Sequence, residues 1–141
     1  MRGLTITALL AILAATVLGC STSSYSMPEQ ERSRVYPAPF DAVWDAISAA
    51  LVDVKFQATD RRREDGVVKA RSGWKMTDAH GYEVSVLVTR LSPTETRVEV
   101  GAEVGSKQNP ADFGGSRARV REFLSALDAR LRKRQARFSG S

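Results

Sequence analysis

Two helical stripes of apolar residues, separated by a long alternating stretch, constrain the fold of this chain more than any other feature. Both stripes place apolar side chains at offsets 0, 3, 4, 7 and 11, which puts them on one face of an α-helix. They consist of Phe40, Val43, Trp44, Ile47 and Leu51, and of Val120, Phe123, Leu124, Leu127 and Leu131. We expect helices over about 39–52 and 116–134, and each must bury its apolar face against another layer.

Between the two stripes, the chain alternates apolar and polar residues with the period of two that is typical of β-strands. The alternation predicts strands at about 54–59, 68–76, 82–89 and 96–104, and a further short strand is expected at 34–36. Short turns at 60–66, 78–81 and 91–95 make neighbouring strands antiparallel, and a single apolar face means that the sheet is covered on one side. The predicted order is β-α-β-β-β-β-α. This is a two-layer α+β domain over residues 34–134, with an antiparallel sheet covered on one face by two helices, and a frayed tail at 135–141.

The first 20 residues have the organisation of an export signal. Arg2 gives a basic start, residues 4–18 are mostly apolar and carry no charge, and Cys20 follows Gly19 directly. The apolar run is shorter than the about 20 residues that a membrane-spanning helix needs, so we expect a signal peptide at 1–19. A conventional signal peptide with an incidental cysteine is the alternative.

The run Val17-Leu18-Gly19-Cys20 resembles the lipobox of bacterial lipoproteins. The resemblance implies that diacylglycerol is attached to the Cys20 thiol and that the chain is cut before this residue, and two or three acyl chains give stable anchoring. Ser21 in place of Asp implies, by the sorting rule of enteric bacteria, an outer-membrane address facing the periplasm. Cys20 is the sole cysteine, which excludes an intrachain disulfide, and the polar segment 20–33 is predicted to be a flexible tether.

The segment Tyr36-Pro37-Ala38-Pro39-Phe40-Asp41-Ala42-Val43-Trp44-Asp45-Ala46, followed by a four-stranded meander and a terminal helix, resembles small uncharacterised bacterial lipoproteins. It is also similar to the helix-grip domains of the C lipoprotein of the β-barrel assembly machinery. The resemblance covers about residues 34–133. It implies a helix-grip-like fold and an envelope address, and it brings no catalytic residues.

The residue content of the chain argues against most enzyme chemistry. The single histidine, His80, falls in a predicted turn, and a zinc site or a His-based triad lacks partners because the one cysteine carries lipid. Glu83, Glu99 and Glu103 fall on the predicted solvent face, where basic residues of neighbouring strands can pair with them. We therefore expect no catalytic residues, no metal and no cofactor. The net charge of +5 would suit nucleic acid in a cytosolic protein, but an exported protein is not expected to meet it.

Two surfaces are candidates for binding. Trp74 and Met76, with Phe113 from the long loop at 105–115, can rim an apolar patch for a ligand or partner. The alternative is that Trp74 and Met76 pack in the core. The second surface is the basic end of the final helix, which suits both the negative helix C-terminus and an anionic lipid or polymer surface. A solubilising basic face is its alternative. This surface consists of Arg130, Arg132, Lys133 and Arg134.

The sequence therefore predicts a lipid-anchored envelope protein whose domain is a non-catalytic interaction or scaffold module for an envelope protein partner. The alternative is a periplasmic carrier that binds a lipid or other apolar ligand in a helix-grip cavity. That cavity would be lined by Phe56, Trp74, Val86, Val100 and Phe123. An enzyme acting on the cell wall would instead need convergent carboxylates with shifted pKa values in a cleft. The identity of the partner and the oligomeric state stay open.

Overall fold

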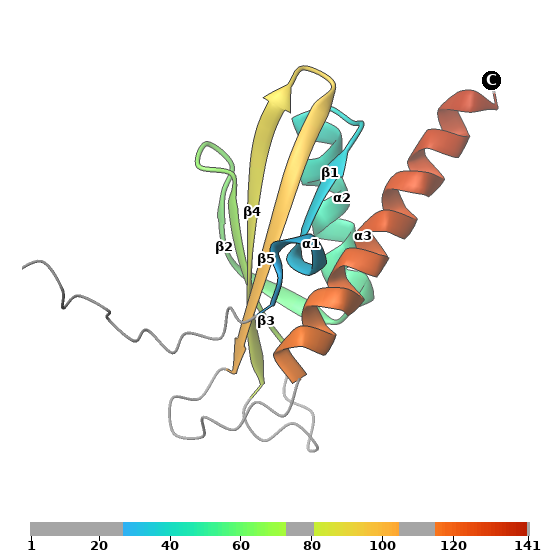
Figure 1. Cartoon of the computed structure of the whole chain (residues 1–141). Helices are drawn as coiled ribbons and strands as arrows, with labels where there is room; N and C mark the ends of the chain where they lie inside the picture. The colour runs from blue at the N-terminus through green and yellow to red at the C-terminus, as the bar shows by residue number, and fades with distance from the viewer. Residues whose placement is uncertain (1–26, 73–80, 105–114, 141) are drawn as a thin grey trace, which may run out of the picture.

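The computed structural model describes residues 27–72, 81–104 and 115–140. The described elements are α1 (Glu29–Arg32), β1 (Ser33–Tyr36), α2 (Phe40–Asp53), β2 (Phe56–Arg62), β3 (Val67–Ser72), β4 (Tyr82–Ser92), β5 (Glu95–Val104) and α3 (Gly115–Ser139). The five strands form one antiparallel sheet in the order β1-β5-β4-β3-β2. Helices α2 and α3 lie on the same face of this sheet (Figure 1), which confirms the predicted two-layer α+β fold.

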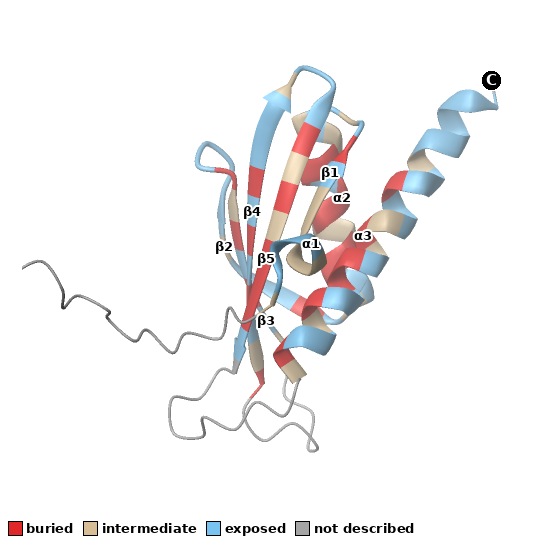
Figure 2. Ribbon diagram, viewed as in Figure 1, coloured by how far each residue is buried: buried red, intermediate tan, exposed pale blue. Residues whose placement is uncertain are grey.

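The core lies between the sheet and the two long helices (Figure 2). Nine of the ten residues in the predicted helical stripes are buried, and the tenth, Phe40, is half-buried. The alternation in the central strands is confirmed as well, because the inward side chains of β4 and β5 are at most 4% exposed from Val84 to Val88 and from Thr96 to Val100. The spacing of apolar residues along the chain therefore decides which faces meet.

Strand β2 is longer and less regular than the alternation predicts. Phe56 is buried, but Val54 forms the C-cap of α2 instead of belonging to the strand, and Ala58 is exposed. The register against β3 shifts between Ala58 and Asp60, and the strand then continues to Arg62, where the sequence predicts a charged turn. β2 is an edge strand that pairs only with β3. Its backbone hydrogen bonds to β3 can therefore form without a regular alternation of apolar and polar side chains.

The predicted boundaries at both ends of the domain are wrong. Residues 29–32 of the predicted tether form α1 and Ser33 begins β1, because β1 pairs with β5 and Glu31 accepts a hydrogen bond from Arg121 of α3 at 2.7 Å. At the other end, α3 continues to Ser139 through the predicted frayed tail, since residues 135–139 include no glycine or proline to stop it. The predicted signal peptide and Cys20 lie outside the described residues.

A buried hydrogen bond joins the N-terminal strand to the last helix. The hydroxyl of Tyr36 in β1 donates to Oδ1 of Asp128 in α3 at 2.7 Å, and Tyr36 is 7% exposed. Burial, and then the hydrogen bond to Asp128, raise the pKa of Tyr36 well above its ordinary value. The edge strand and the helix layer are thus held together by a polar contact as well as by apolar packing.

Candidate functional site: the basic end of the long helix

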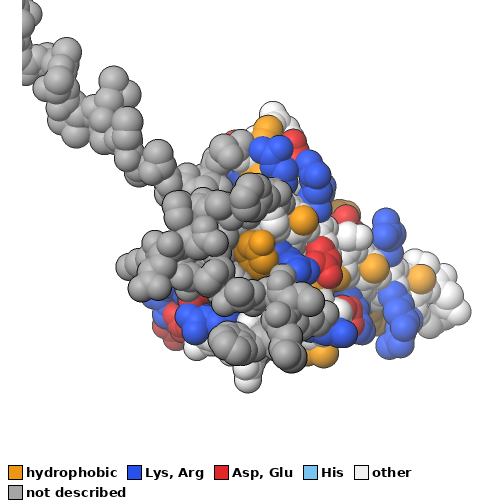
Figure 3. Space-filling model, turned by 90° about the horizontal axis from the view of Figure 1, so that it is seen from below, with side chains coloured by type: hydrophobic (Ala, Val, Ile, Leu, Met, Phe, Trp, Pro, Cys, Tyr) orange, Lys and Arg blue, Asp and Glu red, His pale blue; other side chains and the backbone are white. Residues whose placement is uncertain are grey.

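Helix α3 continues beyond the layer that it covers. Its buried side chains end at Leu131, yet the helix runs to Ser139, and its C-terminal turns project sideways, away from the sheet (Figure 1). The apolar stripe recurs once more at Phe138, seven residues after Leu131, and this side chain is 76% exposed. Between residues 129 and 140 there are five basic residues and no acidic one. Lys and Arg side chains accordingly gather along the projecting end (Figure 3).

The first of these basic residues, Arg130, binds α2. Its Nε donates a hydrogen bond to Oδ2 of Asp53 at 2.6 Å, and its Nη2 bonds the other carboxylate oxygen. This two-pronged contact lowers the pKa of Asp53 and raises that of Arg130. Both side chains are partly exposed, so water screens the charges. The main effect of the pair is therefore to fix where α3 crosses α2.

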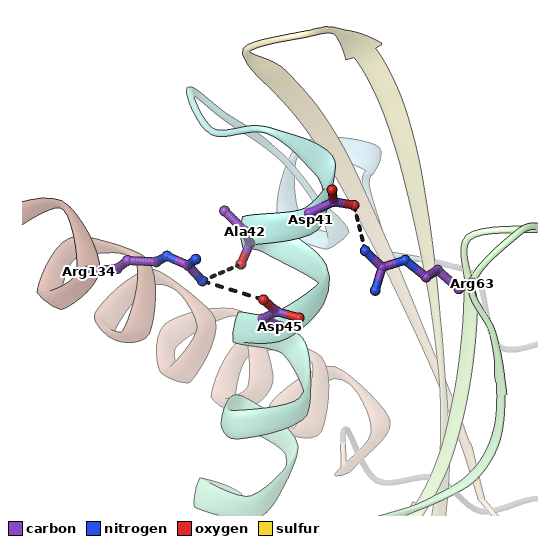
Figure 4. Close-up of polar contacts among 5 residues, drawn as sticks. All are labelled: Asp41, Ala42, Asp45, Arg63 and Arg134. Carbon is purple, nitrogen blue, oxygen red and sulfur yellow. Dashed lines mark hydrogen bonds and ion pairs between the residues drawn. The ribbon is translucent and has the colours of Figure 1, made fainter.

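Arg134 contacts α2 one helical turn further on. Its Nη1 donates to the carbonyl oxygen of Ala42 at 3.5 Å and lies 3.8 Å from Oδ2 of Asp45 (Figure 4). On the other side of α2, Nη2 of Arg63 donates to Oδ1 of Asp41 at 2.6 Å, from the turn between β2 and β3. Arginines from two different elements thus hold the N-terminal half of α2 in place.

A hollow of about 360 Å³ lies between α2 and the projecting part of α3. Its lining carries four basic side chains and one acidic side chain, with two alanines and an aromatic ring as the apolar part. Among the described residues, Lys133 and Arg137 form no ion pair. The hollow is therefore electropositive, and two of its four basic side chains are not held in ion pairs with described residues. The lining residues are Asp45, Ala46, Ala49, Arg130, Lys133, Arg134, Arg137 and Phe138.

The structure divides the predicted basic surface. Arg130 and Arg134 contact carboxylates of α2, whereas Arg132 and Lys133 form no ion pair with the described residues, and Arg132 does not line the hollow. Arg137 and Phe138 complete the lining. Arg137 belongs to the same basic run but is not part of the predicted surface, and sequence reasoning missed Phe138. The signal for Phe138 in the sequence is the recurrence of the apolar stripe seven residues after Leu131, in a segment without a helix breaker.

The predicted apolar patch, formed by Trp74, Met76 and Phe113, lies outside the described residues, and so does His80. Of the five residues expected to line a carrier cavity, Trp74 is outside as well. The other four belong to one buried cluster between the sheet and the helices, and each is at most 5% exposed. These four are Phe56, Val86, Val100 and Phe123.

The acidic residues of the outer sheet face are partly paired as predicted. Arg71 of β3 binds Glu83 of β4 across the strands, which confirms that expected pairing. Glu99 instead lies 3.6 Å from Arg32 of α1, an element that the sequence does not predict. Within the described part of the chain, no group of three or more His, Cys, Asp or Glu side chains could hold a metal ion. None of the described helices is long and apolar enough to cross a membrane.

Comparison with known proteins gives a match to no protein-family model and to no curated protein. Several solved structures match. The adenylate sensor from AMP-activated protein kinase, in complex with ZMP, is 13% identical over 67% of this chain and 93% of that chain, with a TM-score of 0.48. The di-domain ARO/CYC StfQ from the steffimycin biosynthetic pathway is 18% identical over 74% of this chain and 45% of that chain, with a TM-score of 0.42. TTHA0849 from Thermus thermophilus is 15% identical over 70% of this chain and 92% of that chain, with a TM-score of 0.33.

Proposed function

We propose that this protein is a lipid-anchored cell-envelope protein, held through acylated Cys20 at the periplasmic face of the outer membrane. Its α+β domain is a non-catalytic interaction or scaffold module at that surface. The observation that carries the proposal is the position of Cys20, directly after Gly19 at the end of an uncharged apolar run. Two or three acyl chains on one residue anchor a protein stably, whereas a single chain does not.

The start of the folded domain supports a role close to the membrane. Only residues 21–28 separate Cys20 from α1, which begins at Glu29. A fully extended chain of this length spans about 30 Å, roughly the diameter of a small domain. The segment between Cys20 and α1 is thus shorter than the tether of residues 20–33 that the sequence predicts. A domain held this close can reach both the lipid surface and proteins embedded in it.

The titratable groups with shifted pKa values support a non-catalytic role. Hydrogen bonds from arginines of α3 lower the pKa of Glu31 in α1 and of Asp53 in α2, and burial raises the pKa of Tyr36 in β1. Each shift accompanies a contact that joins two elements of the fold. A catalytic acid or base needs, in addition, a cleft in which it converges with a second functional group.

Metabolic labelling with a palmitate analogue tests the anchor. In a Gram-negative host, we expect the wild type and the matched control Ser23→Ala to be labelled and to sediment with membranes. We expect Cys20→Ser to carry no label and not to sediment with membranes. Ser21→Asp should move labelled protein from the outer to the inner membrane fraction. A wild type that carries no label and stays soluble would contradict the proposal.

Lipid extraction from the purified protein separates an interaction module from a carrier. A module should release no apolar molecule, since its own acyl chains stay covalently attached, whereas a carrier should release about one ligand per protein chain. Crosslinking in cells would then identify the envelope protein that the module contacts.

A further inference from the structure

We propose that the hollow between α2 and the end of α3 binds the anionic headgroups of the membrane that carries the anchor. The contact is reversible, and it acts beside Cys20 as a second attachment that orients the domain. This inference rests on the proposed function, because acylation of Cys20 is what brings the domain to the lipid surface. The hollow itself is defined by residues of the folded domain alone.

Charge complementarity identifies the occupant. Lys133 and Arg137 line the hollow without ion pairs among the described residues, and Arg130 and Arg134 add positive charge behind them. Each basic side chain near an anionic lipid surface strengthens binding by about fivefold. The C-terminal end of a helix carries a partial negative charge of about half an elementary charge, which these cations outweigh. A second copy of this chain would bring like charges together at the same place.

The exposed ring at the mouth of the hollow favours a lipid surface over a soluble anion. Phe138 is 76% exposed and lines the same hollow as Lys133 and Arg137. Apolar and aromatic side chains beside basic ones are typical of helices that lie at a membrane interface, where the ring enters the headgroup region and the cations meet phosphate. A soluble phosphate would use the cations and leave the ring in water.

The geometry allows both attachments to reach one membrane. Glu31 in α1 accepts a hydrogen bond from Arg121 of α3, so the tether enters the domain beside the N-terminal part of α3. Arg137 follows Arg121 by 16 residues, which is about 24 Å along a helix. The tether from Cys20 to α1 spans up to about 30 Å, so the acyl chains and the helix end can contact the same surface.

Vesicle sedimentation tests the inference with residues 20–141 carrying Cys20→Ser. The core cluster lies entirely between Tyr36 and Leu131, so removal of residues 1–19 takes nothing from it. Vesicles of phosphatidylcholine are compared with vesicles of equal parts phosphatidylcholine and phosphatidylglycerol. We expect binding to the anionic vesicles only, and we expect it to weaken as salt rises from about 0.1 M to about 1 M, because the Debye length falls from about 10 Å to about 3 Å.

Matched variants locate the contact. Lys133→Gln with Arg137→Gln should weaken binding by at least about tenfold, since two cations near the surface are removed. Lys69→Gln with Arg117→Gln removes the same charges from other exposed positions and should leave most of the binding. Arg132→Gln, on the same helix end but outside the hollow, should have a smaller effect than Lys133→Gln. Phe138→Ser should remove the part of the binding that survives high salt.

Three results would overturn the inference: equal binding to neutral and anionic vesicles, equal losses in the hollow and control double variants, or a dimer in solution that Phe138→Ser dissociates. Because the tested protein carries no acyl chain, the vesicle result does not depend on the anchor. Failure of the anchor appears in the labelling experiment instead, so the two failures are distinguishable.

Discussion

The turn between β2 and β3 depends on one glycine that meets the backbone of β4. Gly66 has a φ of 66°, and a Cβ atom placed on it would lie 2.1 Å from the carbonyl oxygen of Val88. The same two residues are joined by a hydrogen bond, in which the Val88 N–H donates to the Gly66 carbonyl oxygen at 2.7 Å. Any side chain at position 66 must therefore push the turn away from β4.

We expect Gly66→Ala to lower the free energy of unfolding by about 2–4 kcal/mol. The left-handed backbone conformation costs an alanine about 1 kcal/mol. The clash is with a backbone atom and cannot be relieved by a rotamer change, so the turn must move. That movement loses the hydrogen bond to Val88, which contributes about 1 kcal/mol, and loosens the packing of a residue that is 4% exposed. The total is a large share of the about 5–15 kcal/mol that stabilises a domain of this size.

Gly81→Ala is the matched control, because Gly81 has nearly the same backbone conformation without the close approach. Its φ is 60°, and a Cβ atom there would meet the Ser72 Oγ at 3.3 Å and the Ser72 carbonyl oxygen at 3.5 Å. We expect a loss of only about 1 kcal/mol, mainly from the backbone conformation, because the Ser72 hydroxyl is the end of a side chain and can shift by a few tenths of an ångström. Urea unfolding followed by far-ultraviolet circular dichroism measures both variants. Equal losses would refute the argument that contact with Val88 determines the need for glycine at position 66.

Two further changes test the interior. Burial raises the pKa of Tyr36 in the folded state above its value of about 10 in the unfolded chain. The contribution of Tyr36 to the free energy of unfolding is therefore complete below about pH 10 and declines at higher pH, by up to about 1.4 kcal/mol per pH unit. Tyr36→Phe should abolish that part of the alkaline slope in urea titrations, and an unchanged slope would assign it to other groups. Phe123→Ala should cost about 3–5 kcal/mol, because Phe123 is fully buried. A loss below about 1 kcal/mol would instead indicate that this ring lines a void, as the carrier alternative requires.

The elements that the sequence predicts well are those whose burial is regular. In β4 and β5, Val86 and Val100 are register partners near the centre of the sheet. Apolar and polar residues alternate there because one face of the sheet is covered by helices and the other is exposed to solvent. In β2, the bulge between Ala58 and Asp60 breaks the alternation, and an edge position tolerates charged residues such as Arg62. The pattern of side chains therefore predicts central strands better than it predicts an edge strand.

The partners of the basic residues could not be predicted, because they depend on how two helices cross. Arg130 and Asp53 are 77 positions apart in the chain, and nothing local relates them. From the sequence alone, Arg130 suits a helix C-terminus or an anionic surface equally well. The hollow has the same origin, since α2 supplies Ala46 and Ala49 to it and α3 supplies Phe138. The sequence shows the charge bias of the helix end and the recurrence of the apolar stripe at Phe138, but not the hollow that these residues line.

The paired arginines suggest a last test of the hollow, in which binding is strengthened instead of weakened. Asp45 is the one acidic residue in its lining, and its contact with Arg134 is long, at 3.8 Å, and exposed to solvent. Asp45→Asn should therefore leave the fold intact and tighten binding to anionic vesicles by about fivefold, as one unit of charge near the surface predicts. Asp65→Asn makes the same change in net charge at an exposed carboxylate that pairs with Arg62, away from the hollow, and should have little effect. If both substitutions tighten binding equally, the overall charge of the protein governs its attraction to the membrane, and the hollow has no special part in it.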